Sequence, residues 1–221
     1  MLCDRPPAVH ALLRVSDFDA LEWEGRRPVW VRAQLQRAPW VVVRRSEQRP
    51  GVWPVGVRGS LRAQRCAAWL PDCAVEDCVT PQLLSVRRAW RQHRGSDANP
   101  PFVVLEEVAA ILAAHGHAGR WGPCGSVGFE LATALPCTTP DSDLDLVLQA
   151  DRPIARDDAC RLHADLSKLP VRIDLLLEMP HGAVALSEYA MAGGMLLLRC
   201  AQGPRLVRDP WSADGLVASS A

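Results

Sequence analysis

The sequence is poor in lysine and lacks both long apolar runs and paired cysteine motifs. Of its 25 basic residues only Lys168 is a lysine, and arginine use this heavy is not by itself evidence for phosphate binding. No stretch of about 18 apolar residues is present, which argues against a transmembrane helix. The first residues, MLCDRPPAVH, lack the apolar segment of a signal peptide. We therefore expect a soluble, cytoplasmic protein with no membrane partner.

Other absences exclude two further classes of function. The eight cysteines never form C-x-x-C, and their spacings do not resemble a zinc site, so we expect small buried thiols. The net charge is zero and no stripe of alternating basic and aromatic residues occurs, which argues against a nucleic-acid binder.

The zero net charge hides an asymmetry between the two parts of the chain. Residues 1–100 carry 16 Lys and Arg against 10 Asp and Glu, whereas residues 101–221 carry 9 against 15. A Pro- and Gly-containing segment, RGSDANPP, follows the basic part and is typical of a linker. The sequence therefore predicts a basic domain over residues 1–95, which meets an anionic partner or substrate, and an acidic domain over 96–221.

The most informative stretch is GSVGFELATALPCTTPDSDLDLVL, residues 125–148. Its second part contains an acidic strand, Ser142 to Leu146. Side chains alternate between the faces of a strand, so Asp143 and Asp145 are expected on one face and the leucines on the other. Two neighbouring carboxylates repel unless a cation lies between them, and a hard divalent ion such as Mg²⁺ is the usual solution.

Two further features accompany this acidic strand. Gly125 and Ser126 precede a short predicted helix over residues 127–135, where free backbone N–H groups favour a phosphate. Asp174 lies in a later apolar strand, residues 171–177, where an unpaired carboxylate costs desolvation energy. Asp174 is therefore a third candidate metal ligand; the alternative is an exposed edge-strand acid that pairs near Arg172.

The basic part predicts a smaller α+β domain. Strands are expected over 10–15 and 40–44, and an edge strand or loop over 52–57, which contains Pro54. Ser60 is read as the cap of a helix that runs to about Leu70, and 71–81 as a loop. That helix would carry Arg58, Arg62 and Arg65 on one side, suited either to phosphate or to a solvated surface.

The remaining chain predicts helices separated by strands. Helices are expected over 82–93, 102–115, 155–168 and 186–192, strands over 195–200 and 205–207, and a turn at His181–Gly182. The fold class is α+β, with a mixed sheet and flanking helices in the C-terminal domain.

The order of these features resembles the nucleotidyltransferase superfamily of the polymerase-beta type. They are a Gly-Ser pair, a helix, S-D-L-D-L on a strand and an aspartate on a later strand. Sixteen residues separate Ser126 from Asp143, more than in many members. Almost the whole chain is similar to the malonate decarboxylase phosphoribosyl-dephospho-CoA transferases. The segments that carry this similarity are V-G-V-R-G-S-L-R-A-Q-R, I-D-L-L-L-E, G-A-V-A-L-S-E-Y and G-P-R-L-V-R-D-P-W.

The resemblance implies an enzyme that attaches a prosthetic group. It would move phosphoribosyl-dephospho-CoA from triphosphoribosyl-dephospho-CoA to a serine of the acyl carrier protein subunit, releasing diphosphate. Asp143 and Asp145 would hold Mg²⁺, and Asp174 would complete a second metal site or accept the serine proton. Gly125 and Ser126 would bind phosphates, and the three arginines would contact the carrier or the precursor. Two alternatives remain: another Mg²⁺-dependent nucleotidyltransferase that uses ATP, and a catalytically silent binding subunit of the same fold.

Overall fold

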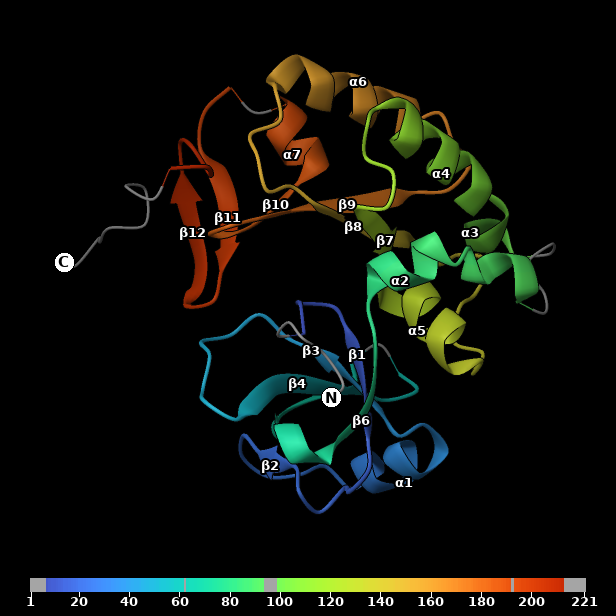
Figure 1. Ribbon diagram of the computed structural model, residues 1–221, viewed down its shortest axis with the longest axis vertical. Coiled ribbons are helices and arrows are strands. Elements are labelled where there is room, and N and C mark those ends of the chain that lie inside the picture. Colours follow the sequence, from blue (N-terminus) through green and yellow to red (C-terminus); the bar gives the residue numbers. More distant parts are fainter. Residues whose placement is uncertain (1–6, 62, 94–98, 192, 213–221) are drawn as a thin grey trace.

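The computed structural model describes residues 7–61, 63–93, 99–191 and 193–212, and these form two α+β units, each with its own six-stranded sheet (Figure 1). The mixed α+β class expected from the sequence is confirmed. Each unit has its own apolar core, one centred on Leu13, Val31 and Leu70, the other on Leu105, Leu146 and Leu177. No helix among the described residues has the length and apolar character needed to cross a membrane.

The first unit is an antiparallel sheet in the order β2-β5-β4-β3-β1-β6. Its elements are β1 (Leu12–Val15), β2 (Glu22–Trp23), α1 (Trp30–Arg37), β3 (Trp40–Val43), β4 (Val52–Arg58), β5 (Arg65–Pro71), the short 3-10 helix η1 (Asp72–Ala74) and β6 (Val75–Val79). The strands expected at 10–15 and 40–44 are therefore present.

Three expectations for this unit were wrong. The segment expected to be an edge strand or loop is the interior strand β4. Pro54 is tolerated there because it lies where the pairing with β3 ends, so its missing N–H removes only one hydrogen bond. The expected loop at 71–81 contains η1 and β6. The expected helix from Ser60 to Leu70 is instead a hairpin of β4 and β5, because both segments alternate apolar side chains toward one core.

The second unit has the sheet order β12-β11-β10-β9-β8-β7. Its elements are α2 (Pro81–Val86), the short 3-10 helix η2 (Ala89–Gln92), α3 (Pro100–Val103), α4 (Leu105–Ala114), β7 (Trp121–Pro123), α5 (Gly125–Thr133), β8 (Leu144–Gln149), α6 (Arg156–Leu166), β9 (Ile173–Met179), β10 (Gly182–Ala185), α7 (Leu186–Met191), β11 (Leu196–Cys200) and β12 (Gly203–Val207). Strand β10, which follows the expected turn, was not predicted.

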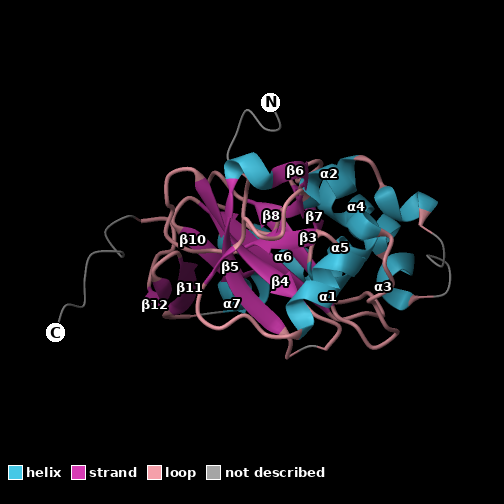
Figure 2. Cartoon of the chain, turned by 90° about the horizontal axis from the view of Figure 1, so that it is seen from below, coloured by secondary structure: helices cyan, strands magenta, loops and turns pink. Residues whose placement is uncertain are grey.

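The single parallel pair among these strands, β8 and β9, explains the placement of α6. Parallel neighbours need a crossover connection, and α6 supplies it. Helices α4, α6 and α7 cover one face of the sheet, and its other face is turned toward the first unit (Figure 1). In the view from below, the strands of the two sheets overlie each other (Figure 2).

The two units also make an apolar contact. Phe129 of α5 packs with Leu12 and Ala38 of the first unit. The sequence places a division at residues 95 and 96; in the structure the first sheet ends at Val79, and α2 already packs on the second unit. The N-terminal end of α2 is capped by Thr80, whose Oγ1 accepts from the Leu83 N–H at 3.1 Å.

Candidate active site

Asp145 and Asp174 lie directly opposite each other on the two parallel strands. Asp145 of β8 is the register partner of Asp174 of β9, so both side chains are on the same face, the one turned toward the first unit. Asp143 precedes the first residue of β8, so the strand alternation that predicts its direction does not apply to it. The leucines that alternate with these acids are buried on the helix-covered side.

The charges of the other two carboxylates act on Asp145. Burial raises the pKa of Asp145, and the charges of Asp174 and Asp143 raise it further. Arg58 and His10, both from the first unit, act in the opposite direction. Asp174 is more open to solvent and has the Nε atom of Arg172 at 3.5 Å from its Oδ1. Thus one acid is partly enclosed, and the other lies at the surface beside an arginine.

Gly125 lets the start of α5 approach Asp145. The helix begins at Gly125, two residues before the predicted start, and Gly125 has φ of +58°. A Cβ at this position would lie 1.9 Å from Oδ2 of Asp145, so no other residue fits without moving that carboxylate. The Cys124 N–H also donates to the Asp145 carbonyl at 2.9 Å. Ser126 is the second residue of α5 and is 7% exposed.

The segment between α5 and β8 is fixed by the buried carboxylate of Glu130. Its Oε2 accepts from the N–H groups of Cys137 and Thr138 at 2.8 and 2.7 Å, and its Oε1 lies 3.0 Å from Nε2 of His93. Burial alone would raise the pKa of Glu130, but these hydrogen bonds outweigh burial and lower it. The chain that leads into Asp143 is therefore held against α5.

Two of the three predicted arginines lie together, though not on a helix. Arg58 ends β4, Arg65 begins β5, and they are register partners across the hairpin. Both line the same cleft as Asp145 and Asp174. Arg62 lies outside the described residues. The proximity of Arg58 and Arg65 thus comes from strand pairing rather than from helical spacing.

The cleft between the two units has a volume of about 1150 Å³. The second unit contributes Asp145, Asp174 and Gly125 together with two arginines, and the first unit contributes only basic side chains among its charged groups there, which are Arg44, Arg45, Arg58 and Arg65. A site with carboxylates on one wall and arginines around them suits an anionic ligand that is also bound to a metal ion.

An ion pair across the cleft was missed by the sequence prediction. Arg45 Nη2 donates to both carboxylate oxygens of the buried Glu178, at 2.5 and 2.7 Å, and His10 Nε2 lies 3.4 Å from Oε1. Burial alone would raise the pKa of Glu178, but His10 and Arg45 outweigh it and lower the pKa. Strand alternation could have indicated Glu178, because it shares the face of Asp174; nothing local indicates Arg45.

The donor set fits Mg²⁺ on chemical grounds. Mg²⁺ prefers oxygen ligands and is usually held by one or two carboxylates together with substrate phosphates. Asp145 can supply one of those carboxylates, and Asp143 and Asp174 are the two candidates for the second. Within the described part of the chain, no three His, Cys, Asp or Glu side chains already stand as a complete ion site.

Comparison with known proteins gives matches over both units. Residues 8–81 match the family model described as the phosphoribosyl-dephospho-CoA transferase MdcG N-terminal domain, and residues 86–210 match the model of the C-terminal domain. No solved structure matches the chain.

Curated relatives match over most of their length. A protein of Pseudomonas aeruginosa is 40% identical over 83% of this chain and 85% of its own. Proteins of Azotobacter vinelandii and Klebsiella pneumoniae are each 38% identical, over 93% and 94% of this chain and 94% and 98% of their own. All three are named phosphoribosyl-dephospho-CoA transferase.

Proposed function

The chain belongs to the phosphoribosyl-dephospho-CoA transferase family, and we propose that it attaches this group to the acyl carrier protein subunit of malonate decarboxylase. The donor is the triphosphate precursor, triphosphoribosyl-dephospho-CoA, and the acceptor is a serine hydroxyl of the carrier. The observation that supports this most is the pair Asp145 and Asp174, which face arginines across one cleft.

The second unit is proposed to act as a nucleotidyltransferase domain. Support comes from the order of its parts: a Gly-Ser helix start, an acidic strand and a third aspartate on the parallel neighbour. The close approach of Gly125 to Asp145 ties the first two parts together in space. The phosphate-binding role of Ser126 remains part of this proposal.

The proposed step is a substitution at the α-phosphorus of the precursor. The serine oxygen forms a new bond to that phosphorus, the bond to the bridging oxygen breaks, and diphosphate leaves. Asp174, the more exposed carboxylate, accepts the serine proton. Asp143 and Asp145 would hold Mg²⁺, which when bound neutralises the charge that develops on the transferred phosphoryl group and on the leaving group.

The arginines of the first unit complete the site. Arg58 and Arg65 are positioned to bind the outer phosphates opposite the carboxylates, and both can form paired hydrogen bonds to phosphate oxygens. In the same cleft they would also attract an acidic carrier protein. Arg45 acts differently, because it is already bound to Glu178 and holds the two walls together.

The test is incubation of the protein with apo carrier, the triphosphate precursor and Mg²⁺, with the carrier weighed by mass spectrometry. We expect the mass of one phosphoribosyl-dephospho-CoA group to appear on the carrier. Asp145→Asn should slow this by about 10²-fold or more, because the carboxylate is needed in the transition state. Asp157→Asn, an exposed acid in the first turn of α6, is the matched control and should transfer at the wild-type rate.

A carrier that gains no mass with the wild-type protein would refute the proposed reaction. Transfer of an AMP group from ATP would favour a different nucleotidyltransferase. Wild-type rates in Asp145→Asn would remove this carboxylate from the mechanism and leave the acceptor assignment intact.

A further inference from the structure

The sheet of the second unit has a gap beside the start of β9. β10 pairs with β9 only from Met179 to Leu176, and after Ala185 the chain turns into α7. Residues 173–175 therefore have β8 on one side and, among the described strands, no partner on the other. The gap lies next to Asp174, a residue of the candidate active site.

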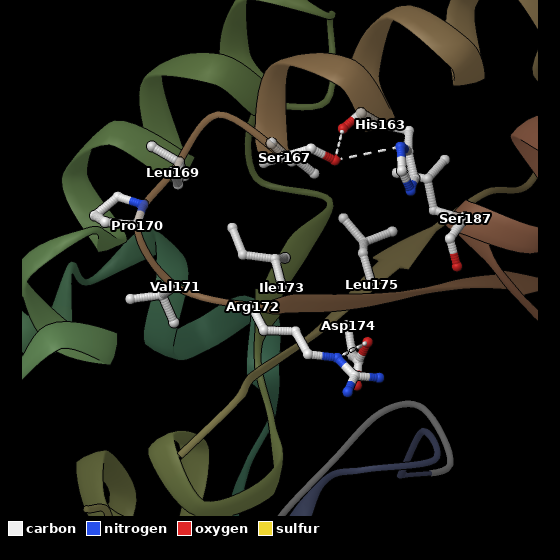
Figure 3. A pocket seen from close by; sticks show the side chains of 12 residues that line it. His163, Ser167, Leu169, Pro170, Val171, Arg172, Ile173, Asp174, Leu175 and Ser187 are labelled. Atoms are coloured by element: carbon white, nitrogen blue, oxygen red, sulfur yellow. Dashed lines mark hydrogen bonds and ion pairs between the residues drawn. The ribbon is translucent and has the colours of Figure 1, made fainter. Parts of the chain in front are cut away.

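Two cavities meet at this gap. A second cavity of about 480 Å³ lies on the helix-covered face, between the end of α6 and the start of β9 (Figure 3). Ile173 and Leu175 point from β9 toward α6, whereas Arg172 and Asp174 point the opposite way (Figure 3). Arg172, Asp174, Leu175 and Ser187 line both this cavity and the cleft. The two cavities therefore adjoin each other at Asp174.

The second cavity has a different chemical character from the cleft. Its lining combines the buried Leu166, Leu169 and Leu186 with the polar side chains of His163, Ser167 and Ser187, and Arg172 and Asp174 lie where it meets the cleft. Its volume lies in the range of about 300–1,000 Å³ that is common for small-molecule sites. A mixed lining of this kind suits a neutral, flexible chain that carries polar amide groups.

The strand edge adds hydrogen-bonding groups. The N–H and C=O of successive strand residues point alternately to the two neighbouring strands. The carbonyl of Arg172 accepts from the Leu144 N–H on the β8 side, so the backbone groups of Ile173 and Leu175 are directed toward the gap. A chain that carries amide groups could pair with this edge as a short added strand does.

Building on the proposed function, we infer that the cavity binds the pantetheine arm of the precursor. Dephospho-CoA consists of adenosine diphosphate joined to pantetheine, a neutral flexible chain with amide groups and a terminal thiol. The phosphates occupy the cleft between carboxylates and arginines, and the arm passes through the gap beside Asp174 along the edge of β9. The cavity thereby distinguishes a CoA-derived donor from a plain nucleotide.

The test compares two probes that differ only in the arm, dephospho-CoA and ADP, by isothermal titration calorimetry on the full chain. Ser187→Trp places a large side chain at the exposed mouth shared by the cavity and the cleft. Ile173→Trp is a second blocking variant, on the strand edge itself. Ala164→Trp adds the same bulk to an exposed position of α6 that does not line the cavity, and is the matched control.

We expect the wild type to bind dephospho-CoA about tenfold or more tightly than ADP, because the arm fills a pocket that ADP leaves empty. Both Ser187→Trp and Ile173→Trp should remove this difference, while Ala164→Trp keeps it. Ile173 does not line the cleft, so Ile173→Trp should also leave ADP affinity unchanged. Equal affinity for both probes in the wild type, or a difference that survives both blocking variants, would overturn the arm site. Wild-type transfer to the carrier in the same preparations would show that the proposed function stands even then.

Discussion

Replacing Gly125 with alanine tests how closely α5 supports Asp145, the proposed catalytic carboxylate. The new Cβ would lie 1.9 Å from Oδ2, 2.8 Å from Cγ and 2.9 Å from Cβ of Asp145, all far inside contact distance. The φ of +58° adds about 1–2 kcal/mol of backbone strain for a residue with a side chain. Relief of the overlap by moving the carboxylate or the start of α5 should cost a further ~1–3 kcal/mol.

The matched control is Gly116→Ala. Gly116 also has a positive φ, +78°, but nothing lies within 4 Å of an added Cβ. It therefore carries the backbone strain without the overlap. In urea unfolding, we expect Gly116→Ala to lose only the strain component and Gly125→Ala to lose clearly more. Carrier modification should be unchanged in Gly116→Ala and slower by about 10²-fold in Gly125→Ala, since a displacement near 1 Å of a catalytic group has that effect.

A double variant separates overlap from general misfolding. In an Asp145→Ala background, two of the three overlapping atoms are absent, so Gly125→Ala should cost little more stability than Gly116→Ala does. The reasoning would be refuted if Gly125→Ala transferred at the wild-type rate, or if its loss of stability were the same with and without the Asp145 carboxylate.

Three further outcomes are expected. Arg45→Gln should lower the free energy of unfolding by about 3–5 kcal/mol, because it leaves the buried Glu178 carboxylate unpaired; unfolding at the wild-type midpoint would contradict this. The pKa of Glu178 is lower in the folded protein than its ordinary value near 4.5. The Glu178 carboxylate therefore contributes fully to the free energy of unfolding above pH 4.5, and this contribution is lost as the pH falls through the folded pKa. The acid-induced loss of stability should therefore be shallower in Glu178→Gln, and an identical pH profile would exclude Glu178 as its source. Arg58→Gln should raise KM for the precursor about tenfold, with the larger effect at low salt. Arg37→Gln, which changes an exposed residue at the end of α1, should leave KM unchanged. If KM in Arg58→Gln equals the wild-type KM, Arg58 does not bind the precursor.

The acidic part of the site could be predicted from local pattern. Asp145 and Asp174 each lie in a short apolar strand, where the two-residue period fixes which face a side chain takes. The same period applies to Glu178, whose partner could not be predicted because Arg45 is 133 residues away in the chain. Local pattern thus indicates that a carboxylate faces inward, but not what it meets.

The segment after Ser60 shows where local pattern fails. Arginines at 58, 62 and 65 fit a helical face, yet β4 and β5 pair because each buries alternate side chains in a core built with distant strands. Arg58 and Arg65 reach the cleft through that pairing.

The sequence by itself determined the α+β class, the acidic strands and the presence of a helix after the Gly-Ser pair, because these follow from short-range periodicity. Only the tertiary structure decided that Asp145 and Asp174 are register partners, that arginines of the first unit face them, and that β10 stops short of Asp174. Those features depend on which strands pair and where each ladder ends, and packing across the whole chain sets both.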